Sequence, residues 1–323
     1  MALIKRAYRS RLVQTMVPLA VLLVALGIMA RLIVHEYGSI ERELRSLQPD
    51  LVIVSLAAAV AATLGGGVLW KFILAACEVD LPLTETLRIW CLSTPAKYGL
   101  GAISQYAGRV YLAERAGIPH RTALISLVME LGLIILSGLV VLLILVPLGG
   151  SVLLPGIPPS VLTAGPVVGI LIVAFLPVVV CRTMSIMPSQ WNRDVVLRAA
   201  PRARLALLVV VVNWLLLGST CFLLAAAMTP VAPTLYPFFV FAVVLAVLSG
   251  LLAVTPLGLG VRDVVLAVAL ALVIPAPLAT AAALLHRLTN VVAEFICAGA
   301  VLGLSSRDPR RRVISRVNRP GGD

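Results

Sequence analysis

The chain has 323 residues, of which 61% are hydrophobic and only 12% are charged, and its mean hydropathy is +1.08. Soluble domains carry about a quarter charged residues, so this composition excludes a soluble globular protein and predicts a chain embedded in lipid. The net charge of +12 comes largely from basic clusters that flank apolar segments, which indicates the positive-inside rule of membrane proteins rather than nucleic-acid binding.

The side chains that usually build metal or catalytic sites are sparse and scattered. Five cysteines form no CxxC pair, and the three histidines lie far apart in the sequence. We therefore expect no metal, no cofactor and no enzymatic activity. His120 and His286 lie near the ends of expected helices, which favours interfacial positions for both.

The first half of the chain is expected to alternate full spans with one irregular zone. Apolar runs predict helices at about residues 17–34, 51–77 and 121–147, the first preceded by a basic cytoplasmic segment. The triplet Gly65-Gly66-Gly67 in the second helix would let another helix approach closely. Residues 83–118 are too polar for a span and too apolar for a free loop, so we predict a re-entrant hairpin.

The second half repeats this pattern. After a Gly- and Pro-rich linker, full helices are predicted at about residues 161–181, 205–228 and 278–304, with an arginine-rich inner loop between the first two. The apolar stretches 238–254 and 263–274 are interrupted by a glycine-rich turn, and the second is too short for a full span. This pair predicts a second hairpin.

The predicted fold class is an all-α polytopic membrane protein. It has about six full transmembrane helices and two re-entrant or broken helical hairpins, arranged as inverted repeats within a single domain. The repeats are expected at residues 1–148 and 161–304, and residues 305–323 form a basic cytoplasmic tail. Inverted repeats with broken helices are typical of transporters.

Charged residues inside apolar segments are the sharpest functional signal, because each costs about 2.5–3.5 kcal/mol at a helix centre. We predict the following residues to bind an anionic lipid head group: Lys97, Tyr98, Arg109, Gly258, Gly260, Arg262, Arg287 and Asn290. Glu130, Asp263 and Glu294 are expected to act as their charge partners or as a proton relay.

Two features support these assignments, and each leaves an alternative open. Arg287, Asn290 and Glu294 share one helical face, which fits either a cavity lining or a helix–helix salt bridge such as Arg287 with Glu130. The turn Gly258–Asp263 could offer backbone N–H groups and Arg262 to a phosphate. Its glycines could equally serve only a tight turn, and the cations at 97–109 could belong to a cytoplasmic loop.

At the two hairpins the sequence resembles the lysylphosphatidylglycerol synthase/flippase transmembrane family. The resemblance rests on Lys97-Tyr98-x-x-Gly101, on Gly108-Arg109, and on the Gly-x-Gly-x-Arg-acid turn at residues 258–263. It covers roughly residues 10–305, with Leu100 standing where close members have proline. The resemblance implies the flippase-like half without the soluble synthase domain.

These observations predict a flippase or scramblase for an anionic phospholipid, a glycolipid or a polyprenyl-phosphate-linked lipid. The alternative is a non-transporting accessory subunit of an envelope glycosyltransferase or lipid-modifying system. Expected partners are the lipid itself and, for either role, a glycosyltransferase or synthase. A homo-oligomer is compatible with the sequence, and nucleic acid is not expected. The expected location is the bacterial inner membrane, with both termini cytoplasmic.

Overall fold

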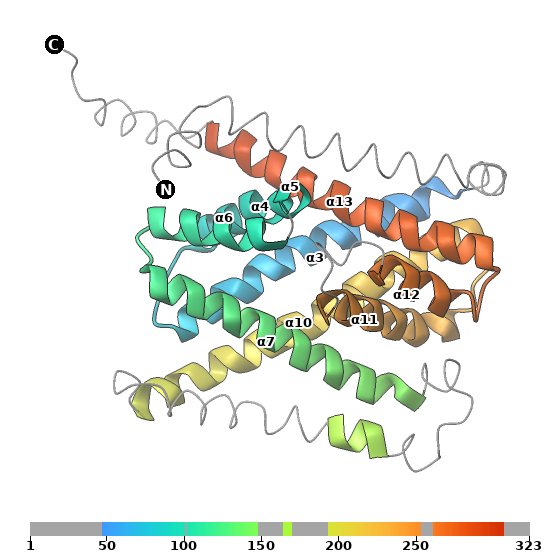
Figure 1. Cartoon of the computed structure of the whole chain (residues 1–323), viewed down its shortest axis with the longest axis horizontal. Helices are drawn as coiled ribbons and strands as arrows, with labels where there is room; N and C mark the ends of the chain where they lie inside the picture. The colour runs from blue at the N-terminus through green and yellow to red at the C-terminus, as the bar shows by residue number, and fades with distance from the viewer. Residues whose placement is uncertain (1–46, 101, 148–163, 170–192, 253–260, 307–323) are drawn as a thin grey trace.

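The computed structural model describes residues 47–100, 102–147, 164–169, 193–252 and 261–306, and all its regular structure in these ranges is helical (Figure 1). The helix predicted at 17–34 and the glycines Gly258 and Gly260 lie outside the described residues. Of the helix predicted at 161–181, only residues 164–169 are described, and they are helical.

Five helical segments in the described part are long and apolar enough to cross a membrane. They are α3 (Pro49–Ala76), α7 (His120–Leu145), the Leu205–Met228 part of α10, the Pro233–Leu251 segment that includes most of α11, and the Ala276–Leu304 part of α13. Between 28% and 50% of each apolar window is buried within the protein, so the remaining apolar surface must face lipid. The chain is a polytopic all-α membrane protein, and the predicted helices at 51–77, 121–147, 205–228 and 278–304 are confirmed.

One boundary prediction was wrong. The arginine-rich loop expected before residue 205 is helical from Arg193, because α10 runs over Arg193–Met228. Arginine, alanine and leucine all favour helix, so the backbone continues as a helix even where the sequence is too polar for lipid. At 36 residues α10 is about 54 Å long, well beyond the hydrocarbon thickness.

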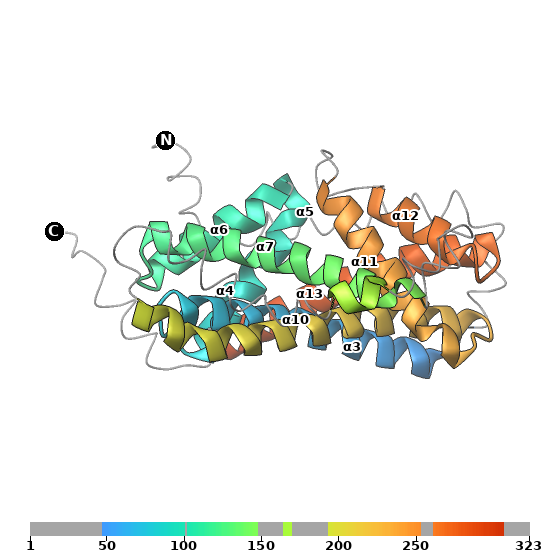
Figure 2. The same ribbon diagram turned by 90° about the horizontal axis from the view of Figure 1, so that it is seen from below.

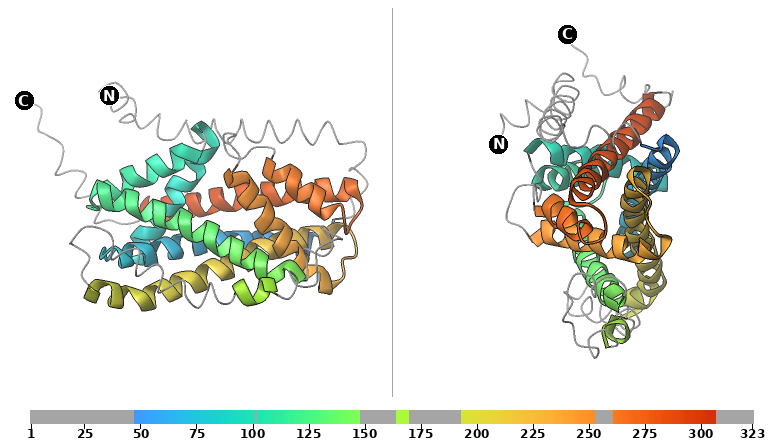
Figure 3. Two further views of the ribbon diagram at one scale, coloured as in Figure 1. Left: turned by 60° about the horizontal axis from the view of Figure 1, so that its bottom comes forward. Right: turned by 90° about the vertical axis from the view of Figure 1, so that its right-hand side faces the viewer.

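Both predicted irregular zones are broken helices. The first consists of α4 (Leu83–Ser93), the 3₁₀ turn η1 (Thr94–Ala96), α5 (Lys97–Leu100) and α6 (Ala102–Arg115). The second consists of η3 (Pro233–Leu235), α11 (Tyr236–Leu252) and α12 (Val261–Leu270), before α13 (Ala276–Ser306). Figures 2 and 3 show α5 and α6 of the first zone on the same side of the molecule as α11 and α12 of the second. Re-entry of the hairpins into the membrane stays a prediction.

The break after α4 has a local cause in the sequence. The hydroxyl groups of Ser93 and Thr94 both donate hydrogen bonds to the Trp90 carbonyl, at 3.0 and 2.8 Å. Pro95 follows and has no N–H to donate to a continuing α-helix. The Ser104 hydroxyl then donates to the Ala96 carbonyl at 2.5 Å, which ties the start of α6 to the turn.

Helix packing in the two halves is equivalent. Exchanging α3 with α10, α4 with α11, α6 with α12 and α7 with α13 converts each packed pair among these eight helices into another packed pair. For example, α3 packs on α13 as α10 packs on α7, and α4 packs on α13 as α11 packs on α7. This is the pattern that an internal repeat produces, while the repeat boundaries and the opposite orientation of the halves stay predictions.

The three consecutive glycines of α3 accommodate side chains from two neighbours. A Cβ on Gly66 would lie 2.3 Å from the Trp90 ring of α4, and one on Gly67 would lie 2.7 Å from Leu87. A Cβ on Gly65 would lie 2.5 Å from the Asn213 side-chain oxygen of α10. The triplet therefore allows the close approach that the sequence predicted, and it seats Trp90 against α3.

Gly66→Ala is expected to lower the free energy of unfolding by about 1–3 kcal/mol, because the Trp90 ring must move out of a close-packed notch. Gly132→Ala in α7 is the matched control, since an added Cβ there meets no atom within 4 Å. The measurement is thermal unfolding of the purified proteins in the same detergent. Equal stability of the two variants would contradict the packing described here.

Candidate functional site

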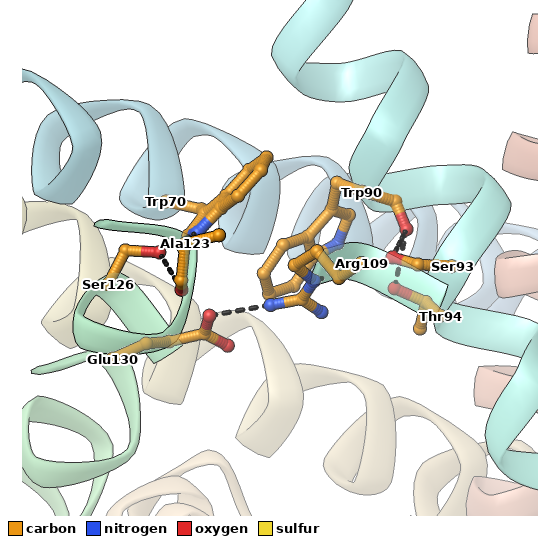
Figure 4. Close-up of polar contacts among 8 residues, drawn as sticks. All are labelled: Trp70, Trp90, Ser93, Thr94, Arg109, Ala123, Ser126 and Glu130. Carbon is orange, nitrogen blue, oxygen red and sulfur yellow. Dashed lines mark hydrogen bonds and ion pairs between the residues drawn. The ribbon is translucent and has the colours of Figure 1, made fainter. Parts of the chain in front are cut away.

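Arg109 of α6 is fully enclosed by protein and forms an ion pair with Glu130 of α7 (Figure 4). The two residues are 1% and 4% exposed, and the Arg109 Nη1 atom lies 2.5 Å from Glu130 Oε2. A charged pair this deeply buried is tolerated only when both partners are engaged. The pair therefore fixes the second arm of the first hairpin against the helix that follows it.

Two tryptophans and two serines complete this buried site. The Arg109 guanidinium lies 3.8 Å from the centroid of the Trp90 ring and 5.7 Å from that of Trp70, within the range of cation–π attraction. Arg109 Nε donates a hydrogen bond to Ser93 Oγ at 3.3 Å. Trp70 Nε1 donates to Ser126 Oγ of α7 at 3.1 Å. Trp70, Trp90, Ser93 and Ser126 were not predicted as site residues, because nothing local in the sequence marks them as neighbours of Arg109.

The pairing of Glu130 with Arg109 corrects one sequence-based alternative. A salt bridge between Glu130 and Arg287 is absent from the described residues, since Arg287 forms its ion pair with Asp263 of α12. Helical spacing places Glu130 and Arg287 at similar heights in their helices, but it carries no information on which helices touch. Among the described residues, Arg109 also shares no hydrogen-bond or ion-pair partner with Lys97 or Arg287.

A second group of charges surrounds the middle third of α13. Lys97 Nζ of α5 lies 2.5 Å from Glu294 Oε1 of α13, and Arg287 of α13 pairs with Asp263. The side chains of Lys97, Asp263 and Arg287 are about a fifth exposed, whereas Glu294 is 9% exposed. These contacts bring the tips of both hairpins to one helix.

Tyr98 and Arg262 complete this group. The Tyr98 ring stacks on Phe295 with centroids 6.0 Å apart, and Lys97 Nζ lies 5.1 Å from the Tyr98 centroid. Tyr98 interacts electrostatically with Arg262, Arg287 and Glu294. Arg262 in turn interacts electrostatically with Asp263, Arg287, Tyr98 and Glu294. We refer to these six residues as the α13 cluster: Lys97, Tyr98, Arg262, Asp263, Arg287 and Glu294.

The α13 cluster has an excess of positive charge. It contains three cations and two carboxylates, and each carboxylate is already paired with Lys97 or Arg287. Within the described part of the chain Arg262 has no carboxylate within ion-pair distance, although it lies among the same charges. Gly250 of α11 allows this position, since a Cβ there would lie 3.1 Å from the Arg262 Cβ. The cluster therefore has one cation available for an additional anion.

The two halves carry corresponding ion pairs of opposite polarity. In the first half the second hairpin arm supplies the cation, Arg109, and the following long helix supplies Glu130. In the second half the arm supplies the anion, Asp263, and the following helix supplies Arg287. The first pair is almost fully buried and the second is about a fifth exposed. Corresponding helices thus form a sealed contact in one half and a more accessible one in the other.

Asn290 and His286 are two further polar residues of α13, and both are directed into the protein or onto their own helix. The Asn290 side-chain amide donates a hydrogen bond to the His286 carbonyl of its own helix at 2.7 Å. The prediction that His286 is interfacial was wrong, because this residue is 1% exposed and its Nε2 atom has no hydrogen-bond partner among the described residues. It precedes Arg287 by one position, which turns its side chain away from Asp263 and into the protein.

The protein has long apolar helices, two broken hairpins, and ionised side chains enclosed between them. This combination is that of a polytopic membrane protein with a polar interior. The chain belongs to the family described as the lysylphosphatidylglycerol synthase TM region, whose family model matches residues 16–298. It is therefore a membrane protein related to lipid chemistry, and the sequence resemblance is confirmed. No curated protein matches the chain.

Proposed function

We propose that the protein binds an anionic lipid head group at the α13 cluster and moves that lipid between the leaflets of the bacterial cytoplasmic membrane. It performs no chemistry on the lipid. The observation that carries this proposal is that Arg262, in a cluster of three cations and two carboxylates, has no carboxylate within ion-pair distance in the described part of the chain. A cation without a counter-ion at membrane depth is costly, so its retention favours a functional role.

The chemistry of the cluster suits a phosphate-bearing head group. Arginine presents a planar fork of N–H donors that matches phosphate oxygens, and charge-assisted hydrogen bonds are the strongest of their kind. Arg262 and Arg287 lie near each other, and Lys97 reaches the same region from the first hairpin. A phosphate between them would neutralise the excess charge. Arg109 was also predicted to bind the head group. Under this proposal it has a structural role instead, because its ion pair with Glu130 holds the first hairpin in place.

The location of the cluster suits transport rather than surface binding alone. Arg287 and Glu294 lie in the middle third of the Ala276–Leu304 span, where a head group has to pass when a lipid changes leaflet. The hairpin tips that meet there belong to the two equivalent halves of the chain. Relative movement of two such halves is how many transporters expose a central site to each side in turn.

The test is lipid translocation by the purified protein in proteoliposomes. Fluorescent phosphatidylglycerol, phosphatidylcholine and a polyprenyl phosphate would be compared with protein-free vesicles by quenching from outside. We expect faster movement of an anionic lipid, reduced about tenfold or more by Arg262→Ala, because a hydrogen bond to a charged group contributes about 1.5–3 kcal/mol. Arg121→Ala, at an exposed position at the start of α7, removes the same charge and should leave the rate unchanged.

Two outcomes would contradict the proposal. If no lipid moves faster than in protein-free vesicles, the accessory-subunit role becomes the better explanation. If an anionic lipid moves but Arg262→Ala and Arg121→Ala behave alike, the protein is a flippase whose head-group site lies elsewhere.

A further inference from the structure

Glu294 combines burial with an incomplete set of partners. It is 9% exposed, and its Oε1 atom accepts from Lys97 Nζ at 2.5 Å. Its Oε2 atom is buried and accepts no hydrogen bond of ordinary geometry among the described residues, although the Tyr98 side chain interacts with this carboxylate. An unsatisfied buried carboxylate oxygen is unfavourable. It lies in the same cluster as Arg262, a cation without an ion-pair partner in the described part of the chain.

The Lys97–Glu294 ion pair joins the two halves of the chain, unlike the other two ion pairs of the site. Arg109–Glu130 and Asp263–Arg287 each join residues of one half, 21 and 24 positions apart. Lys97 and Glu294 are 197 positions apart and join the hairpin of the first half to the last helix of the second. Breaking this contact would remove the ion pair between α5 and α13 and leave the Tyr98–Phe295 stacking and both within-half pairs in place.

A phosphate placed beside Arg262 would feel the Glu294 carboxylate, since Arg262 interacts electrostatically with Glu294. The two residues are also linked through Arg287, which pairs with Asp263 next to Arg262 and shares a helical face with Glu294. Two anions at such a distance repel each other strongly in a medium of low polarity. The lipid can therefore use Lys97 and Arg262 together only when the Glu294 carboxylate withdraws from Lys97.

We infer that Glu294 is an internal competitor of the lipid phosphate. Its carboxylate holds Lys97 in the empty protein, the phosphate takes its place when the lipid binds, and the carboxylate returns to displace the lipid at release. Glu294 thus sets both the affinity for an anionic head group and the rate at which that head group leaves. This inference rests on the proposed function, because it concerns the same site.

The experiment measures equilibrium binding of dioctanoylphosphatidylglycerol to the purified full chain in detergent, with dioctanoylphosphatidylcholine as the probe lacking net charge. Glu294→Gln keeps the side-chain volume and removes the competing charge, so we expect about tenfold tighter binding of the anionic probe. Translocation at saturating lipid should at the same time become slower, because release loses its internal anion. Glu114→Gln, a carboxylate at the exposed end of α6, is the charge-matched control and should change neither quantity.

The outcomes separate this inference from the proposed function. Wild-type binding that is lost in Arg262→Ala, together with unchanged or weaker binding in Glu294→Gln, would overturn the competitor role and leave the head-group site in place. Absence of anionic-probe binding in the wild type and in Glu294→Gln would overturn both.

A second variant keeps the inference testable if Glu294→Gln does not fold. Lys97→Gln combined with Glu294→Gln removes the ion pair as a unit, so no unpaired charge of that pair remains. The net charge of the cluster is unchanged, and Arg262 and Arg287 remain. We expect this double variant to bind the anionic probe more tightly than Lys97→Gln alone, because both lack the Lys97 donor and only the single variant keeps the competing carboxylate. Equal binding by these two variants would mean that the competitor role is wrong.

Discussion

Arg109→Ala is expected to lower the free energy of unfolding by about 3–5 kcal/mol, the largest stability effect of any single substitution considered. The change leaves the Glu130 carboxylate 4% exposed and without its cation, and it removes the group that fills the space beside Trp90. The measurement is thermal or denaturant unfolding in detergent, followed by tryptophan fluorescence, which Trp70 and Trp90 should report directly.

A double variant separates the ion pair from simple loss of volume. Arg109→Met with Glu130→Leu removes both charges and keeps the site filled, so most of the lost stability should return. Arg109→Lys should recover less of the lost stability than this double variant does. An ammonium group lacks the planar fork with which the arginine contacts both Glu130 and Ser93. A stability for Arg109→Ala within about 1 kcal/mol of the wild type would show that the pair contributes little.

Arg287→Gln and Asp263→Asn are expected to have opposite effects on anionic lipids, although each removes one partner of the same ion pair. If the pair were only structural, the two variants would behave alike. Under the proposed function Arg287→Gln removes a phosphate donor, and translocation of an anionic lipid should fall by about ten- to a hundredfold. Asp263→Asn releases Arg287 from its carboxylate, so binding of the anionic lipid should tighten.

The measurement for this pair is binding and translocation of phosphatidylglycerol, with protein yield and unfolding temperature recorded for each variant. Both side chains are about a fifth exposed, so the remaining partner is less enclosed than in the Arg109–Glu130 pair and both variants should fold. Equal losses of activity in the two variants would favour a structural ion pair and weaken the head-group assignment.

Much of the fold followed from local properties of the sequence. Apolar runs of sufficient length located the spans, because a helix is the structure that satisfies its own backbone hydrogen bonds in lipid. Polar residues beside Pro95 located the first break, which the Ser93 and Thr94 hydroxyls and the proline explain. The end of α10 that extends beyond lipid was missed, because length and apolarity report on burial in lipid and not on helix formation outside it.

The sequence by itself also indicated which charged side chains need partners, since a charge within an apolar segment is too costly to be retained without one. Only the tertiary structure decided who the partners are. Glu130 pairs with Arg109 rather than Arg287, and Lys97 meets Glu294 across 197 positions of chain. Such pairs depend on which helices cross and at what height, and helical periodicity defines the face of each helix but not its neighbour. The sealed pair at Arg109 and the accessible α13 cluster therefore became distinguishable only in the folded protein.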